Sequence, residues 1–342
     1  MTRSRRIAFI SSRTAALAVG LALIGLSLGV VPPAGAASGG SVALVAYSTP
    51  KPAYGALIAA FNETAAGEGV SFSQSFGPSG TQATSVTEGL PADVVNFSLD
   101  PDMQKLVSDG LVAPTWDDGP TKGIVTDSIV SFIVRPGNPK HIKTWADLVK
   151  PGVKVITPNP FSSGSAKWNL MAAYGAQLAL HKTKAQALAY LAALLKNTVA
   201  QPASASAALQ TFLSGVGDVV LDYESDAIYA QNQSEPITIV TPPQTVLIQN
   251  PIAVTTKPAD PAAANAFVKY LLSPAGQTIW AEQGYRPVLA KVAARFDFPK
   301  PKKLFTIASL GGWTSVNTTF FDPTTGKIAA IEQSLGQPTT AS

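Results

Sequence analysis

The residues best suited to chemistry lie in a run of small hydroxylic residues at the start of a predicted helix. Residues 153–156 read as a strand, prolines follow, and Ser162-Ser-Gly-Ser165 leads into an apolar helical stretch. The first N–H groups of a helix have no internal partner, and the helix dipole places partial positive charge there. Small residues let an oxyanion approach these donors, and serine hydroxyls add further ones. The turn therefore predicts an oxyanion site, with an ordinary capped helix start as the alternative.

Three further turns of similar composition follow predicted strands or precede predicted helices. They are Phe76 to Thr81, Ser48 to Pro50 directly after the first strand, and Pro202 to Ala207. In open α/β sheets, ligands bind at the carboxyl ends of the strands. Each turn alone is unspecific, but the four together predict a pocket built from neutral hydrogen-bond donors.

Strands alternate with helices along the chain, and this alternation must position the turns. Predicted strands at 41–47, 70–76 and 92–97 are each followed by a polar turn or a helix, and the pattern continues to a strong helix over 261–272. Such alternation predicts parallel β/α layers. A chain with about 300 residues after its leader usually divides into two lobes.

Residues 1–36 have the features of a secretory signal peptide. Basic residues precede an apolar run from Ala15 to Val31, and Ala34-Gly-Ala36 supplies a cleavage site. The whole chain has 25 Lys and Arg against 21 Asp and Glu, but the leader holds four arginines and no acid, which leaves 21 against 21. A balanced mature chain gives no support to nucleic-acid binding. We expect export to the periplasm or another extracytoplasmic space.

The chain offers few groups for metal or cofactor chemistry. It contains no cysteine, so disulfides and thiolate metal sites are excluded. His141 and His181 are its only histidines, and both are expected at the surface. Neither a nucleophile elbow of the form Gly-x-Ser-x-Gly nor a metal-binding pattern accompanies the serines. We therefore expect no cofactor and no metal.

Long local matches in the same order make the chain resemble the periplasmic sulfate-binding proteins of sulfate/thiosulfate ABC importers. The resemblance covers about residues 42–328, and its most specific segments are Pro78–Val86, Ala92–Val95, Val134–Lys140, Lys150–Pro160, Ser162–Gly164, Lys167–Asn169, Gly217–Val219, Ser273–Gln277, Tyr285–Pro287, Lys303–Ile307 and Gly311–Trp313.

This resemblance implies a non-enzymatic receptor with a two-lobed periplasmic-binding-protein-like α/β fold of type II. Each lobe is expected to be a mostly parallel sheet flanked by helices, with two crossovers between the lobes. We expect residues 41–130 plus 253–330 in lobe 1, residues 131–252 in lobe 2, and a frayed tail at 336–342. The implied partners are sulfate or thiosulfate and an ABC permease, and we expect a monomer.

The resemblance also implies which residues hold the anion, through main-chain N–H groups and neutral side chains. Mapped by motif, they are Ser48, Ser79, Ser163, Gly164, Ser165, Ala205 and Tyr223. Four positions depart from the family pattern. Ser48 replaces an aspartate, Ser165 replaces a glycine, Tyr223 replaces a tryptophan that donates its indole N–H, and the arginine usual after Ala205 is absent.

Neutral donors suit sulfate for a physical reason. Sulfate carries no proton near neutral pH and needs only donors, whereas hydrogen phosphate would bury an unpaired O–H at a cost of about 1–3 kcal/mol. The turns contain no carboxylate, and Asp222 and Glu224 are expected to point away from the face that Tyr223 presents. Two alternatives stay open, a binding protein for molybdate or tungstate and a secreted hydrolase of sulfate or phosphate esters.

Overall fold

The computed structural model describes residues 39–340, so the predicted signal peptide lies outside the described residues. Its strands are β1 (Ser41–Tyr47), β2 (Ser71–Gly77), β3 (Val94–Asn96), β4 (Ile124–Val134), β5 (Val155–Ile156), β6 (Thr198–Ala200), β7 (Val219–Tyr223), β8 (Thr238–Val240), β9 (Gln244–Val254), β10 (Arg286–Pro287) and β11 (Lys303–Phe305). The helices that matter for the site follow the strand ends, as the alternation of the sequence predicts.

Two groups of parallel strands share one sheet, in the order β2-β1-β3-β9-β4-β7-β5-β6. Strand β1 pairs in parallel with β2 and β3, and β5 pairs in parallel with β6 and β7. We call the first group and its helices the first half, and the second group and its helices the second half. The predicted parallel β/α layers are therefore present in both halves, while the joining strands are antiparallel.

Strands β4 and β9 run from one half into the other. Strand β4 pairs with β9 through Ile129 and then with β7 from Val130. Strand β9 pairs with β4 through Pro251 and then with β3 from Ile252. These two long strands are thus the crossovers between the halves.

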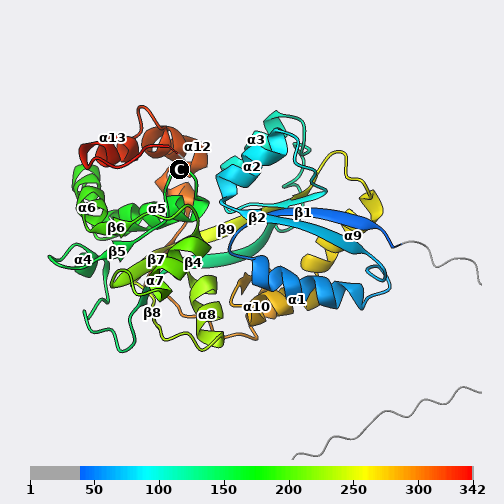
Figure 1. The fold of residues 1–342 in the computed structure, drawn as a ribbon, viewed down its shortest axis with the longest axis horizontal. Coiled ribbons are helices and arrows are strands. Elements are labelled where there is room, and N and C mark those ends of the chain that lie inside the picture. Colours follow the sequence, from blue (N-terminus) through cyan, green and yellow to red (C-terminus); the bar gives the residue numbers. More distant parts are fainter. Residues whose placement is uncertain (1–38, 341–342) are drawn as a thin grey trace, which may run out of the picture. The chain divides into compact units, whose positions relative to one another are not determined.

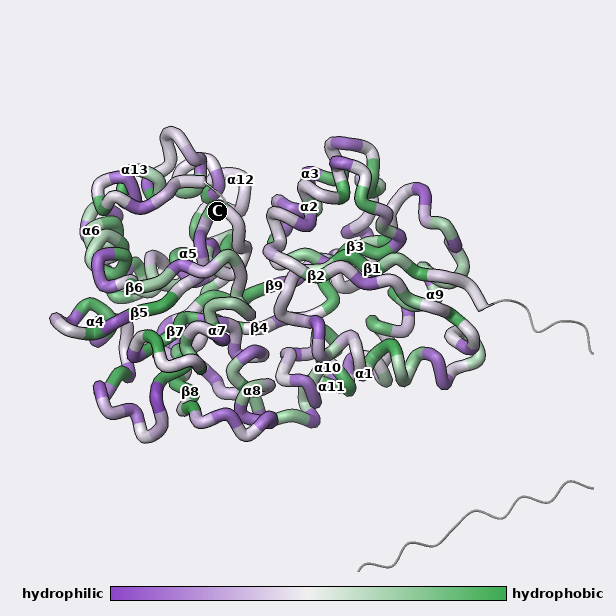
Figure 2. Tube along the Cα trace, viewed as in Figure 1, coloured by the Kyte–Doolittle hydropathy of each residue, from purple (hydrophilic) through white to green (hydrophobic). Residues whose placement is uncertain are grey.

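Helices cover both faces of the first half. Alternate residues of β1 face opposite ways, as strand geometry requires: Leu44 packs with α1 (Lys51–Asn62) and α9 (Pro261–Leu271), while Val45 packs with α2 (Ser79–Thr87) and α3 (Asp100–Ser108). Figure 1 shows α2 and α3 on one side of β1 and β2, and α1 and α10 (Pro274–Glu282) on the other. The tube in Figure 2 is hydrophobic along β1, β3 and β9, which lie between these layers.

The second half repeats this arrangement. Leu221 packs with α5 (Gly164–Ala179) and α6 (Lys184–Lys196), whereas Val220 packs with α7 (Ala205–Leu213) and α8 (Glu224–Asn232). Short helix α4 (Trp145–Leu148) closes one end of the α5 face, where Trp145 stacks edge-on against Phe132.

The C-terminal elements join the second half. Strand β11 pairs with β9, and α12 (Gly312–Val316) places Trp313 edge-on against Trp168 at 4.6 Å between ring centroids. Beyond the turn Asn317–Phe321, α13 (Lys327–Ser334) packs against α6, and Gln201 donates to Glu332. Residues 303–330 thus contact the second core. Two short elements complete the part of the chain that the structure describes, α11 (Ala290–Ala293) and the 3-10 helix Ile307–Leu310.

A buried ion pair ties α8 to β10. Arg286 donates to both carboxylate oxygens of Glu224, at 2.6 and 2.9 Å, and the Glu224 side chain is 1% exposed. Burial raises the pKa of Glu224, and the Arg286 guanidinium opposes that rise. Removing one partner of such a pair leaves a buried charge without compensation.

We therefore expect Arg286→Met to lower the free energy of unfolding by about 3 kcal/mol near pH 7. The loss should shrink as the pH falls toward 4, because the pKa of the unpaired Glu224 rises further in the folded state and the carboxyl takes up a proton. Urea unfolding at several pH values measures both effects. The exposed Arg295→Met is the matched control, and an equal loss in the two variants would contradict the prediction.

Candidate functional site

The start of α5 is held by a rigid, buried turn. Asn159 accepts from the Phe161 N–H through its side chain at 2.8 Å and from the Ser163 N–H through its carbonyl at 2.9 Å. The Ser162 hydroxyl donates to the Ala203 carbonyl at 2.9 Å. Ser163 is the N-cap residue, yet no side chain caps this helix, which begins at Gly164. The N–H groups of Gly164 and Ser165 are therefore left for a ligand.

The start of α2 has the same character. Pro78 precedes the helix, no side chain caps it, and Ser79 is its first residue and is buried. The Ser79 hydroxyl is already paired, because it donates to Asp102 at 2.5 Å and accepts from the Ser98 N–H at 2.9 Å. Ser79 can therefore serve a ligand through its backbone N–H and not through its hydroxyl.

Two more turns lie at the same place. Ser48 follows β1 and precedes α1, and Ala205 begins α7. The side chain of Ser204 caps α7 by accepting from the Ala207 N–H, so the Ala205 N–H at the first helical position remains available.

These turns line one small cavity. Its lining residues are Tyr47, Ser48, Pro78, Ser79, Ser98, Ser163, Gly164, Ser165 and Ala205. The volume is about 10 Å³, roughly the room that one water molecule needs. Ser165 is one of these lining residues, and its buried hydroxyl has no hydrogen-bond partner among the described residues. Six of the seven residues expected at the site thus come together here, three of them from α5 and its cap.

Tyr223, the seventh expected residue, does not line the cavity. It ends β7 and is fully buried, and its hydroxyl lies 2.6 Å from the hydroxyl of Ser98. Ser98, which the sequence reasoning did not single out, does line the cavity. The signal was present, because Ser98 directly follows the strand recognised at 92–97, as Ser48 follows the first strand.

Two charged side chains lie just behind the donors. Burial raises the pKa of Asp102, and Lys167 and the hydrogen bond from Ser79 oppose that rise. Burial likewise lowers the pKa of Lys167, which Asp102 opposes. Lys167 donates to Asn317 at 3.1 Å and does not line the cavity. The pair therefore adds no net charge to the site and leaves the direct contacts to neutral groups.

A pair of buried acids lies behind Tyr223. Asp222 accepts from the Tyr223 N–H at 2.8 Å, and Asp226 accepts from the Thr49 hydroxyl at 2.9 Å. Burial raises the pKa of Asp226 to about 6 and also raises that of Asp222, to which the neighbouring Asp226 contributes. Neither acid lines the cavity, and Glu224 is engaged by Arg286.

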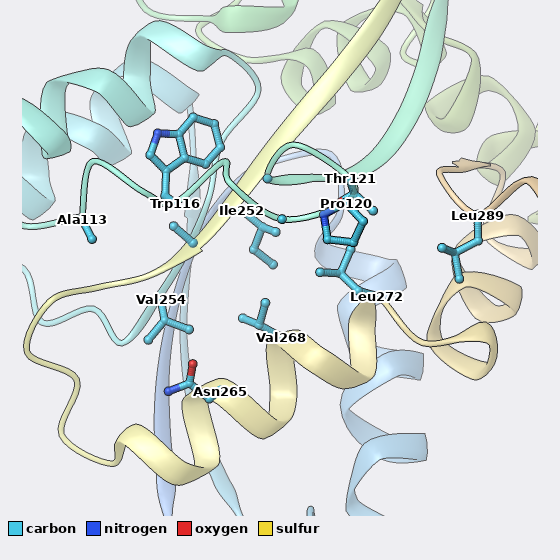
Figure 3. A pocket seen from close by; sticks show the side chains of 13 residues that line it. Ala113, Trp116, Pro120, Thr121, Ile252, Val254, Asn265, Val268, Leu272 and Leu289 are labelled. Carbon is cyan, nitrogen blue, oxygen red and sulfur yellow. The ribbon is translucent and has the colours of Figure 1, made fainter.

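A larger, mostly apolar hollow elsewhere does not suit an anion. One of about 340 Å³ lies between β9, α9 and the loop before β4 (Figure 3). Val254, Val268 and Leu272 project into it, and its polar side chains are few, such as Asn265.

Within residues 39–340, no group of three or more His, Cys, Asp or Glu side chains is placed to hold a metal ion. In the same part of the chain, no helix combines the length and the apolar character needed to span a bilayer.

Comparison with known proteins places this arrangement in a family. Residues 42–286 match the family model described as bacterial extracellular solute-binding protein. A sulfate-binding protein of Synechococcus elongatus is 38% identical over 83% of this chain and 86% of its own length. A thiosulfate-binding protein of Pseudomonas aeruginosa is 35% identical over 75% of this chain and 80% of its own length.

The solved structures give the same result. The sulfate-binding protein SubI from Mycobacterium tuberculosis H37Rv is 45% identical, with a TM-score of 0.81 over 83% of this chain and all of that one. The similarity confirms the expected periplasmic-binding-protein fold, with helices around mixed sheets. The chain therefore belongs to the sulfate-binding protein family of bacterial extracellular solute-binding proteins, a family of non-catalytic receptors.

Proposed function

We propose that this protein captures sulfate, and thiosulfate as a related ligand, outside the cytoplasmic membrane and delivers it as a monomer to an ABC permease. The observation that carries the proposal is the small cavity into which unpaired N–H donors converge from the starts of α2, α5 and α7, together with the unpartnered hydroxyl of Ser165. The sulfate- and thiosulfate-binding relatives support the choice of ligand.

The donors we propose for the anion are those expected from the sequence. Backbone N–H groups come from Ser48, Ser79, Gly164 and Ala205. At the α5 start Ser163 adds its hydroxyl, because its N–H is bonded to Asn159, and Ser165 adds its N–H or hydroxyl. A dianion without a countercharge is tolerated when several such dipoles point at it, because each hydrogen bond is strengthened by its charge. Tyr223 does not line the cavity and contributes indirectly, through the hydrogen bond between its hydroxyl and that of Ser98.

The walls of the cavity come from both halves, which suggests how the ligand enters. Ser48 and Ser79 belong to the first half, and Ser163 to Ser165 and Ala205 belong to the second. We propose that the halves act as two lobes, residues 41–129 with 252–302 and residues 130–251 with 303–334, hinged at β4 and β9. Hinge bending admits the anion, and the closed form is what the permease distinguishes.

Titration calorimetry of the ligand-stripped protein tests the proposal directly. We expect heat and a raised thermal midpoint with sulfate and thiosulfate, and at least tenfold weaker binding of hydrogen phosphate, because no carboxylate lines the cavity to accept its proton. Molybdate and tungstate are the comparison anions. Stronger binding of either than of sulfate would reassign the ligand, and no response to any of these anions would end the proposal.

Ser165 tests the position of the anion. We expect Ser165→Ala to weaken sulfate binding by about 10- to 100-fold, because a hydrogen bond to a charged group is lost. Ser165→Leu should abolish binding, since its side chain fills the cavity. The exposed Ser108→Leu controls for added hydrophobicity. Unchanged affinity in Ser165→Leu, with the fold verified by circular dichroism, would place the anion elsewhere.

A further inference from the structure

Every backbone group of Ser98 is already engaged. Its N–H donates to the Ser79 hydroxyl at 2.9 Å, and its carbonyl accepts from the Trp168 indole at 2.9 Å and from the Asn250 amide at 3.3 Å. Residues of both halves thus hold Ser98 in one position. Its side-chain hydroxyl is the group that remains to act on a ligand.

The Tyr223 hydroxyl determines how the Ser98 hydroxyl is used. The two oxygens are 2.6 Å apart, and Tyr223 is fully buried. Burial raises the pKa of Tyr223 well above its ordinary value, while the bond with Ser98 opposes that rise, so the phenol keeps its proton. A buried O–H needs an acceptor. The Ser98 oxygen, 2.6 Å away, is the acceptor that we assign to the Tyr223 hydroxyl, and the Asn250 amide oxygen already accepts from the Thr126 hydroxyl.

With Tyr223 as the donor of this bond, the Ser98 proton is left free for a ligand in the cavity. Ser98 lines that cavity beside the start of α5, since a Cβ added to Gly164 would lie 2.4 Å from the Ser98 hydroxyl oxygen. The unpartnered hydroxyl of Ser165 lines the same space. Two hydroxyl donors thus flank the exposed N–H groups of one helix start.

We propose that Ser98 is a direct donor to the bound oxyanion and that Tyr223 is a positioning residue that acts through it. This inference rests on the proposed function and assigns a contact that the family motifs do not supply. It also bears on the departure at position 223, where the resemblance implies an indole donor. When Tyr223 donates its proton to Ser98, the Ser98 hydroxyl can in turn donate to the ligand. An indole N–H at position 223 would donate to the ligand without such a partner.

The pair also determines selectivity. While the Ser98 oxygen accepts the hydrogen bond from Tyr223, the Ser98 hydroxyl donates to an anion. It is then less able to accept a hydrogen bond from a protonated anion. Without the phenol, the serine hydroxyl can turn and accept a proton from hydrogen phosphate. The sulfate preference is therefore expected to depend on Tyr223 more strongly than the sulfate affinity does.

A double-mutant cycle with sulfate calorimetry tests this proposal. We expect Ser98→Ala to raise the sulfate Kd by about 10- to 100-fold, and Tyr223→Phe to raise it by about 3- to 10-fold. In the Ser98→Ala background, Tyr223→Phe should cause no further loss of sulfate affinity. Without the Ser98 hydroxyl, the Tyr223 hydroxyl no longer has a partner through which it could act on the anion. Tyr223→Phe alone should reduce the preference for sulfate over hydrogen phosphate by at least threefold.

The controls separate this proposal from the one on which it rests. Ser131→Ala removes a buried hydroxyl away from the cavity and should leave the sulfate Kd unchanged. Sulfate binding by the unaltered protein with an unchanged Kd in Ser98→Ala would overturn the role of Ser98. Additive losses in the cycle would instead make Tyr223 a direct contact. No sulfate heat in the unaltered protein would defeat the proposed function itself, and Tyr223→Phe keeps the comparison available if Ser98→Ala does not fold.

Discussion

A buried anion without a countercharge must be matched by dipoles that point at one place, and this requirement governs the arrangement of the chain. A single helix start offers at most four free N–H groups, which all point in nearly the same direction and so cannot replace the water around a doubly charged ion. The starts of α2, α5 and α7 all open on the cavity, and they belong to different halves of the sheet. The fold can therefore be understood as a means of bringing separate helix starts together.

The strands β4 and β9 connect the two halves of the sheet. Each is a single element of eleven residues that pairs within both halves, so the halves are connected by continuous backbone and not by loose linkers. Because backbone hydrogen bonds continue along both strands, we expect the proposed bending between the halves at the positions where the partners change, near Val130 and Ile252. A cavity whose walls come from both sides of these positions is sensitive to small rotations there.

Much of the fold and of the site could be predicted from the sequence, for local reasons. Strand periodicity and the small residues after each strand mark the β/α alternation, and six of the seven expected ligand residues line the cavity. Two features could not be predicted because they depend on contacts between distant segments. The packing of residues 303–334 on the second half depends on Trp313 meeting Trp168, and the pairing of the Ser79 hydroxyl depends on Asp102 of α3. Ser98 carried a local signal, since it directly follows a strand, but its place beside Gly164 comes from the fold.

The buried acids behind Tyr223, Asp222 and Asp226, bear on the energetics of anion binding. Asp226, whose pKa burial raises to about 6, bonds to Thr49, the neighbour of the cavity residue Ser48. A double negative charge placed nearby disfavours the ionised form of this carboxyl still further. By linkage, we expect capture of the proposed anion to favour proton uptake by this carboxyl in slightly acidic medium, and release of the anion to reverse it. The heat of capture would then contain the ionisation heat of the buffer, and an acidic exterior would strengthen the hold on the solute.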